Sequence, residues 1–163
     1  MKIETLRELL VEELKDLYSA ETQITRALPK LVKAASNDKL KQAFETHLEE
    51  TKQHVQRLEQ IFEQFEESPK GKTCEGMKGL LKEGDERAGE EGDADVLDAG
   101  LIAAAQRVEH YEIAAYGSAH VFAELLGETE VARLLSETLE EEKAADSKLT
   151  QVAKKINVEA KAA

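Results

Sequence analysis

The chain has 163 residues, with 34 Asp and Glu against 22 Lys and Arg, a formal net charge of −12 and 41% apolar residues. This length suits one domain, and the apolar fraction is too high for a disordered acidic tail. The negative charge repels phosphate backbones and anionic membrane surfaces. We therefore expect neither nucleic-acid nor membrane partners, and cations as the natural ligands.

The expected cellular compartment follows from the cysteine content and from the absence of long apolar runs. A single cysteine, Cys74, excludes an internal disulfide and fits a reducing compartment. No apolar run approaches the roughly 20 residues of a membrane span, and the N-terminus, MKIETLRELL, carries acids where a signal peptide needs an apolar core. We expect a cytoplasmic protein.

Apolar residues recur at helical spacing from the start of the chain. The first predicted helix spans about residues 3–35; Thr5 and Glu8 form the pattern of a capping box at its start, and Pro29 is expected to kink it near its end. After a break at residues 36–38, a second helix is predicted to end near residue 66.

Residues 67–93 differ from the helices in amino-acid composition and are predicted to form a connection, with one short amphipathic helix around residues 77–81. A third long helix follows, from about Leu97 to Leu126, and Gly127 is predicted to end it. The fourth long helix begins near residue 128. We expect a single domain over residues 1–157 and a frayed tail at residues 158–163.

The lengths of the links select a topology. The breaks near residues 37 and 127 are so short that each joins two helices as an antiparallel hairpin. The middle link of about 25 residues can travel the length of the bundle and leave the second and third long helices parallel, as in ferritin-like bundles. An up-down-up-down bundle with a long decorated loop is the alternative.

Each long helix places polar residues on its apolar stripe, and a polar group at a buried position is the informative exception. These residues are Glu21, His47, Glu50, His54, Glu109, Glu112, Glu142 and Asp146. Counted outwards from the two turns, all except His47 fall within about 5 residues of one another, roughly 8 Å along a helix axis. His47 lies about one helical turn away, so we expect it to support a ligand or to be a hydrogen-bonded core residue.

Six carboxylates in a dry layer cannot all stay ionised without counter-charges, and no Lys or Arg falls on the same stripes. Two metal ions would neutralise them, and oxygen-rich ligation with one imidazole suits iron first and manganese second. The predicted metal ligands are Glu21, Glu50, His54, Glu109, Glu112, Glu142 and Asp146. If the stripes are instead rotated by one position, these acids are ordinary solvated side chains.

Five segments together resemble the YciF-type, ferritin-like stress-response family over nearly the whole chain: DLYSAETQITRAL, HLEETKQHVQRLE, KGKTCEGMKGLL, IAAAQRVEHYEIAAYG and LLSETLEEEKAAD. The resemblance implies a ferritin-like four-helix bundle, a homodimer, a dinuclear metal site, di-iron in type, and a link to stress responses. Glu109 and Glu112 are similar to the Glu-x-x-Glu pair of rubrerythrin-type proteins. The chain departs from the usual pattern in Asp146, where a His would be expected, and in His54, which follows Glu50 by four residues rather than three.

Two functions are compatible with these features. The first is a metal-binding stress protein whose dinuclear centre reacts with oxygen or peroxide. The second is a non-catalytic stress or scaffold protein that keeps the bundle and acts through protein partners. Tyr18 and Tyr116 lie within a turn of Glu21 and Glu112, and they are expected to be plain core residues or to hydrogen-bond to ligands. His110 and His120 are expected on the surface or at an interface, and Cys74 is expected to be an inert loop thiol.

Overall fold

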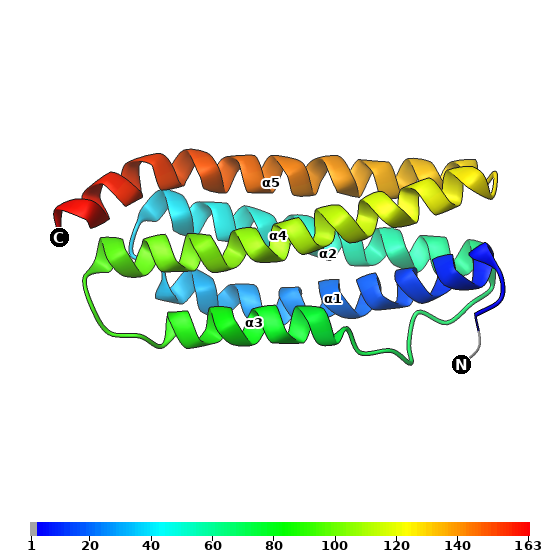
Figure 1. The fold of residues 1–163 in the computed structure, drawn as a ribbon, viewed down its shortest axis with the longest axis horizontal. Coiled ribbons are helices and arrows are strands. Elements are labelled where there is room, and N and C mark those ends of the chain that lie inside the picture. Colours follow the sequence, from blue (N-terminus) through cyan, green and yellow to red (C-terminus); the bar gives the residue numbers. More distant parts are fainter. Residues whose placement is uncertain (1–2) are drawn as a thin grey trace.

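The computed structural model describes residues 3–163, which fold into five helices and contain no strand. The first two residues of the predicted domain lie outside this range. The helices are α1 (Leu6–Ala34), α2 (Asp38–Phe65), α3 (Glu75–Ala88), α4 (Ala94–Leu125) and α5 (Thr129–Ala162). The four long helices form a bundle, and α3 packs against α1 and α4 (Figure 1). The predicted all-α bundle with one extra helix is confirmed.

The long connection carries the chain back along the bundle. Helices α1 and α2 are antiparallel, as are α4 and α5, whereas α2 and α4 run in the same direction (Figure 1). Helix α3 has 14 residues and a length of about 21 Å, so it spans much of the distance that the connection must travel back along the bundle. The connection therefore produces the predicted ferritin-like order of directions, and the up-down-up-down alternative is not adopted.

Polar side chains cap the start of α1 and hold the α1–α2 turn. At the start of α1, Thr5 Oγ1 accepts a hydrogen bond from the Glu8 amide and the Glu8 carboxylate accepts one from the Thr5 amide, which confirms the capping box. At the turn, the buried Asp98 carboxylate of α4 accepts hydrogen bonds from the amides of Ser36 (2.9 Å) and Asn37 (2.7 Å). Asp98 thus fixes the level of this turn against the start of α4.

Helix α3 is longer than the predicted segment 77–81 and extends through the acidic residues that follow it. It packs against α1 and α4, and Asp85 of α3 forms an ion pair with Lys30 of α1. Residues 82–88, which were predicted to belong to the connection outside its short helix, are therefore helical.

Cys74, predicted to be an inert loop thiol, lies in the connection immediately before α3. Its side chain is buried, caps the start of α3 and lies 3.0 Å from the Tyr111 hydroxyl, which donates a hydrogen bond to Asp16. Burial raises the pKa of the Cys74 thiol. A Cβ at Gly76 would lie 2.8 Å from the Tyr111 ring, so this close approach of α3 to α4 requires glycine.

The last helix, α5, continues to Ala162, so all but the final residue of the tail expected to fray is helical. Lys155 and Glu159, one turn apart, form an ion pair at 3.5 Å across this last part of the helix.

The apolar core divides into two clusters, one at each end of the bundle. The cluster at the α1–α2 turn includes Ile24, Leu28, Phe44, Leu101 and Leu149. The cluster at the α4–α5 turn includes Leu14, Leu58, Phe62, Tyr116 and Leu135. No helix within residues 3–163 combines the length and the hydropathy needed to cross a membrane.

Gly127 allows the tight turn between α4 and α5. Its φ is +73°, its amide donates to the Glu124 carbonyl, and the Glu128 amide donates to the Ala123 carbonyl, both at 3.0 Å. This pair of hydrogen bonds is the Schellman arrangement, which leaves the residue after the helix in the left-handed region.

We expect Gly127→Ala to lower the free energy of unfolding by about 1 kcal/mol, because the left-handed conformation is strained for a residue with a Cβ. Urea denaturation followed by circular dichroism measures the change. Gly79→Ala is the control, since Gly79 is exposed inside α3 and a Cβ there meets nothing within 4 Å. This control should be neutral or stabilising; equal losses in the two variants would contradict the prediction.

Candidate metal centre

A layer of ionisable side chains separates the two apolar clusters. Each of its members is at most 6% exposed, and every long helix supplies at least one. We call these residues the polar layer: Glu21, His47, His54, Glu109, Glu112 and Glu142. On each helix the layer lies between a stretch that packs in one cluster and a stretch that packs in the other.

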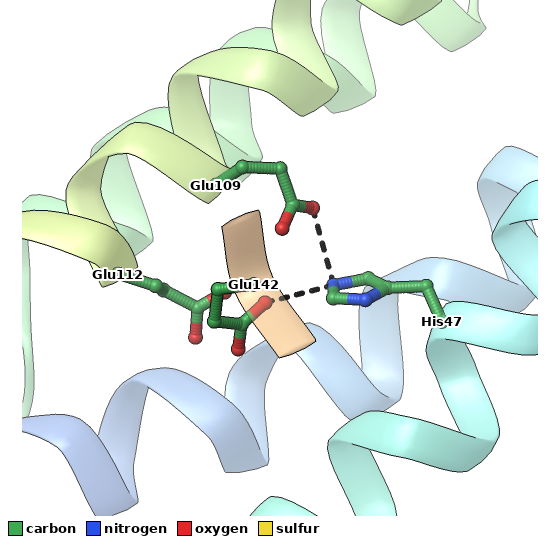
Figure 2. Close-up of side chains that lie close together, drawn as sticks. All are labelled: His47, Glu109, Glu112 and Glu142. Atoms are coloured by element: carbon green, nitrogen blue, oxygen red, sulfur yellow. Dashed lines mark ion pairs between the residues drawn. The ribbon is translucent and has the colours of Figure 1, made fainter. Parts of the chain in front are cut away.

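The first half of the layer joins α2, α4 and α5. His47, Glu109, Glu112 and Glu142 each offer one ligand atom, and these atoms all lie within 4.8 Å of one another. Figure 2 shows the His47 ring directed at the carboxylates from α4 and α5. Its Nε2 lies 3.1 Å from Glu109 Oε1 and 4.0 Å from Glu142 Oε2.

The second half of the layer joins α1, α2 and α5. Glu21, His54 and Glu142 meet within the same 4.8 Å limit. His54 Nδ1 lies 3.3 Å from Glu21 Oε1 and 3.0 Å from Glu142 Oε1. Glu142 therefore belongs to both halves, with one carboxylate oxygen near each histidine.

Hydrogen bonds from outside the layer orient two of its members. His54 Nε2 lies 2.8 Å from Glu141 Oε2, and the Arg57 guanidinium donates to both oxygens of Glu141 at 2.8 and 3.2 Å. Tyr116 donates to Glu21 Oε1 at 2.5 Å, so this tyrosine contacts a predicted ligand. A carboxylate that holds the outer nitrogen of a histidine leaves the inner nitrogen directed into the site.

The polar layer contains buried atoms that no protein group satisfies. Nine buried side-chain nitrogen and oxygen atoms in the described residues lack a hydrogen-bond partner, and all nine belong to the six residues of the layer. Both oxygens of Glu112 are among them. Each such atom costs free energy unless something compensates it. Converging carboxylate oxygens and imidazole nitrogens are the donor atoms that divalent iron or manganese accepts, so the residues fit a metal centre.

The pKa shifts in the metal-free layer also indicate that its carboxylates need compensating charge. Burial, reinforced by neighbouring carboxylates, raises the pKa of Glu109 and Glu112 well above the ordinary value. Burial alone would lower the pKa of the two histidines, but the facing carboxylates outweigh it and raise the pKa of His47 to about 9 and that of His54 to about 11. Without cations, protons must therefore neutralise the layer.

The structure brings five of the seven predicted ligands into the layer and leaves Glu50 and Asp146 outside it. The Glu50 side chain is 37% exposed, and its Oε2 lies 3.8 Å from His47 Nδ1. The next residue, Thr51, takes the buried position. Asp146 is 22% exposed and accepts a hydrogen bond from Gln106. The layer thus holds four carboxylates rather than six, because Glu50 and Asp146 remain partly exposed at the edges of inward faces that are otherwise buried as predicted.

The sequence predicted only a supporting or core role for His47, but the structure places it in the polar layer. The spacing offered a signal: His47, Thr51 and His54 continue the steps of three and four that join Phe44 to Leu58, and all are buried. Glu50 fits steps of three and four between His47 and His54 equally well, so spacing alone does not separate it from Thr51. The layer has two imidazoles where one was expected.

The other polar residues lie where they cannot join the layer. His110 is exposed and its Nε2 lies 3.3 Å from Asp146 Oδ2, while His120 contacts the Ala132 carbonyl. Tyr18 donates a hydrogen bond to Glu59 on the surface rather than to a ligand.

Comparison with known proteins agrees with this architecture. Residues 5–162 match the family described as Domain of unknown function (DUF892). The chain belongs to this family. YciF of Escherichia coli strain K12 is 50% identical over 154 residues, which cover 94% of this chain and 93% of YciF. The predicted resemblance to YciF-type proteins is therefore confirmed.

Solved structures of family relatives show the same fold. The crystal structure of the E. coli stress protein YciF matches with a TM-score of 0.92 and 48% identity, over 94% of this chain and 98% of that one. YcfI of Rhodopseudomonas palustris, which has been suggested to be a structural protein, matches with a TM-score of 0.88 and 48% identity, over 91% of this chain and 95% of that one.

We expect Glu112→Gln to stabilise the metal-free protein near neutral pH, by about 1–3 kcal/mol. The folded-state pKa of Glu112 is raised, so the wild-type protein loses stability as pH rises above the unfolded-state pKa, where the unfolded chain ionises and the folded chain does not. The amide removes that loss. Below about pH 4, where both states are protonated, the gain should vanish.

Urea unfolding in chelator at several pH values tests this expectation. Glu63→Gln, at an exposed position of α2, is the control and should change stability by less than about 0.5 kcal/mol. A Glu112→Gln variant that is less stable than the wild type near neutral pH would contradict the account of the layer.

Proposed function

We propose that the protein is a metal-binding member of its family, with a dinuclear iron or manganese centre in the polar layer. The observation that carries this proposal is the convergence of all nine unpartnered buried polar atoms on one place. Carboxylates that face one another in a dry core cost free energy unless cations or protons neutralise them.

The residues divide between two neighbouring positions. His47, Glu109 and Glu112 would hold one ion, Glu21 and His54 the other, and Glu142 would bridge the two. Bound iron or manganese would supply redox chemistry toward oxygen or peroxide. Glu141 fixes the His54 ring, and Tyr116 holds one oxygen of the Glu21 carboxylate. Two imidazoles among four carboxylates retain the hard-to-borderline character that favours iron and manganese over copper.

A role in the stress response follows by analogy with the E. coli relative, which is described as a stress protein. Under this proposal the protein acts in the cytoplasm, and its centre consumes oxidants or holds reactive metal. The analogy concerns the biological setting, while the chemistry rests on the polar layer.

A second candidate, a non-catalytic scaffold that acts through protein partners, has one observation in its favour. Protonated His47 and His54 would pair with Glu109 and Glu142 at 3.1 and 3.0 Å and neutralise part of the layer without metal. The suggestion that YcfI is a structural protein agrees with such a role. Glu112 separates the two candidates, because neither histidine forms an ion pair with it among the described residues.

We expect the metal-depleted protein to take up two Fe(II) or Mn(II) ions per chain under anaerobic conditions and to gain several degrees in Tm. Ligands that bind only the folded state stabilise it. Glu112→Gln and Glu142→Gln should each reduce the gain, and Glu142→Gln should reduce it most because Glu142 serves both positions. Metal analysis and differential scanning calorimetry measure stoichiometry and Tm.

Glu50→Gln is the matched control, because Glu50 lies on the same helix as two layer residues but outside the layer. It should keep both ions and most of the gain in Tm. Absence of metal uptake, or an equal gain in the Glu142→Gln variant, would favour the scaffold.

We also propose a homodimer through the outer face of α4. Between Arg107 and Glu124 the only Asp, Glu, Lys or Arg residues are Glu109 and Glu112, which are buried in the layer, although 34% of the whole chain is charged. Apart from His110, the exposed positions of this stretch are small or apolar, namely Ala114, Ser118 and Val121, and Leu125 at the end of α4 is also exposed. A second copy of the chain would cover this uncharged face.

Light scattering after gel filtration should give a mass near twice 18.1 kDa for the wild type. Val121→Lys should shift the mass toward one chain, because it places a charge within the face. Val158→Lys, at an exposed valine near the end of α5, should leave the dimer intact. A monomeric wild type would overturn this proposal and leave the metal centre unaffected.

A further inference from the structure

A cavity of about 340 Å³ opens beside the polar layer. Its exposed rim is formed by Gln42, Thr46 and Glu50 of α2 and by Ala144 and Lys148 of α5. Its interior is lined by Ile24, Leu28, Phe44, Ala105 and Leu149. The cavity therefore runs from the surface between α2 and α5 into the apolar cluster at the α1–α2 turn.

Small side chains keep this space open. Alanines from three helices line it: Ala43, Ala105, Ala144 and Ala145. Larger apolar residues at these positions would fill the seam, as they do elsewhere in the core. A volume more than twice the roughly 150 Å³ of an apolar cavity that holds benzene is large enough for a small organic molecule.

The inner wall of the cavity includes two members of the polar layer, His47 and Glu109. Both carry buried atoms without hydrogen-bond partners: the two ring nitrogens of His47 and Oε2 of Glu109. An occupant of the cavity would therefore lie against the half of the layer that Figure 2 shows.

The charges of the lining select the kind of occupant. Glu50 stands at the rim and Glu109 at the inner end, while Lys148 is the only Lys or Arg in the lining. The lining has no excess of either sign of charge, since Glu50 and Lys148 stand at the rim and His47 lies 3.1 Å from Glu109 at the inner end, and the net charge of −12 further disfavours an anion. The wall between the rim and the polar layer is apolar, so it offers no groups that would solvate an ion.

We propose that this cavity binds a small neutral apolar organic molecule and presents it to the metal centre. The occupant packs its apolar body against Ile24, Leu28 and Phe44 and meets the centre at His47 and Glu109. Binding in the cavity depends on the lining alone, whereas contact with metal rests on the proposed function above.

Indole is a suitable probe, because it is neutral and the chain contains no Trp, so its fluorescence is read without interference from the protein. We expect the metal-free and the Mn(II)-loaded proteins to bind indole with a Kd below about 1 mM. Indole-3-acetate, which carries a carboxylate, should bind at least about tenfold more weakly. Tighter binding of indole-3-acetate would overturn the assignment of a neutral ligand.

Filling variants locate the probe. Ala43→Leu and Ala145→Leu should each weaken indole binding at least about tenfold, since the added carbons occupy the cavity. Ala103→Leu, at an exposed position of α4, is the matched control and should bind as the wild type does. Circular dichroism shows whether each variant is folded. Folded filling variants that bind indole normally would overturn the proposal.

Proton relaxation measures contact with the centre. Bound indole should relax faster in the Mn(II)-loaded protein than in the Zn(II)-loaded protein, and Glu142→Gln, which weakens metal binding, should reduce the difference without abolishing indole binding. Manganese uptake without indole binding would overturn the cavity proposal and leave the metal centre standing. Indole binding without metal uptake would overturn the metal centre and its contact with the ligand.

Discussion

The structure depends on one constraint, the neutralisation of four carboxylates that are buried together. Glu21, Glu109, Glu112 and Glu142 lie in a core whose two sides are apolar, and none of the buried polar residues described is Lys or Arg. Two imidazoles supply part of the compensation at most. The remaining charge must be neutralised by protons or by cations. The layer is a binding site only if cations neutralise it, and otherwise it lowers the stability of the fold.

The hairpins and their contacts place the layer at one level. The α1–α2 turn is held against α4 by Asp98, and the α4–α5 turn is closed by Gly127, so both hairpins have fixed starting points. Glu141 and Arg57 then orient His54 from outside the layer. Contacts at the two turns and beside the layer thus help to hold the side chains of the layer at one level.

Helix periodicity and turn lengths were enough to predict the bundle, its order of directions and the level of the layer. Rotation about each helix axis was harder, because one residue turns a side chain by about 100°. Glu50 and Thr51 differ by that step, and the folded structure buries Thr51. The full length of α3 was also missed, because its acidic half buries only Gly84 and so carries no apolar stripe.

The division of the core into two clusters also constrains how the helices can slide past one another. A uniformly apolar bundle tolerates a shift of one turn, about 5.4 Å, because one leucine replaces another. Here the same shift of α1 would drive Glu21 into an apolar cluster and leave Leu17 or Ile24 facing the carboxylates. The buried charges therefore fix the longitudinal alignment of the bundle, and two ions bound between them would together join all four long helices.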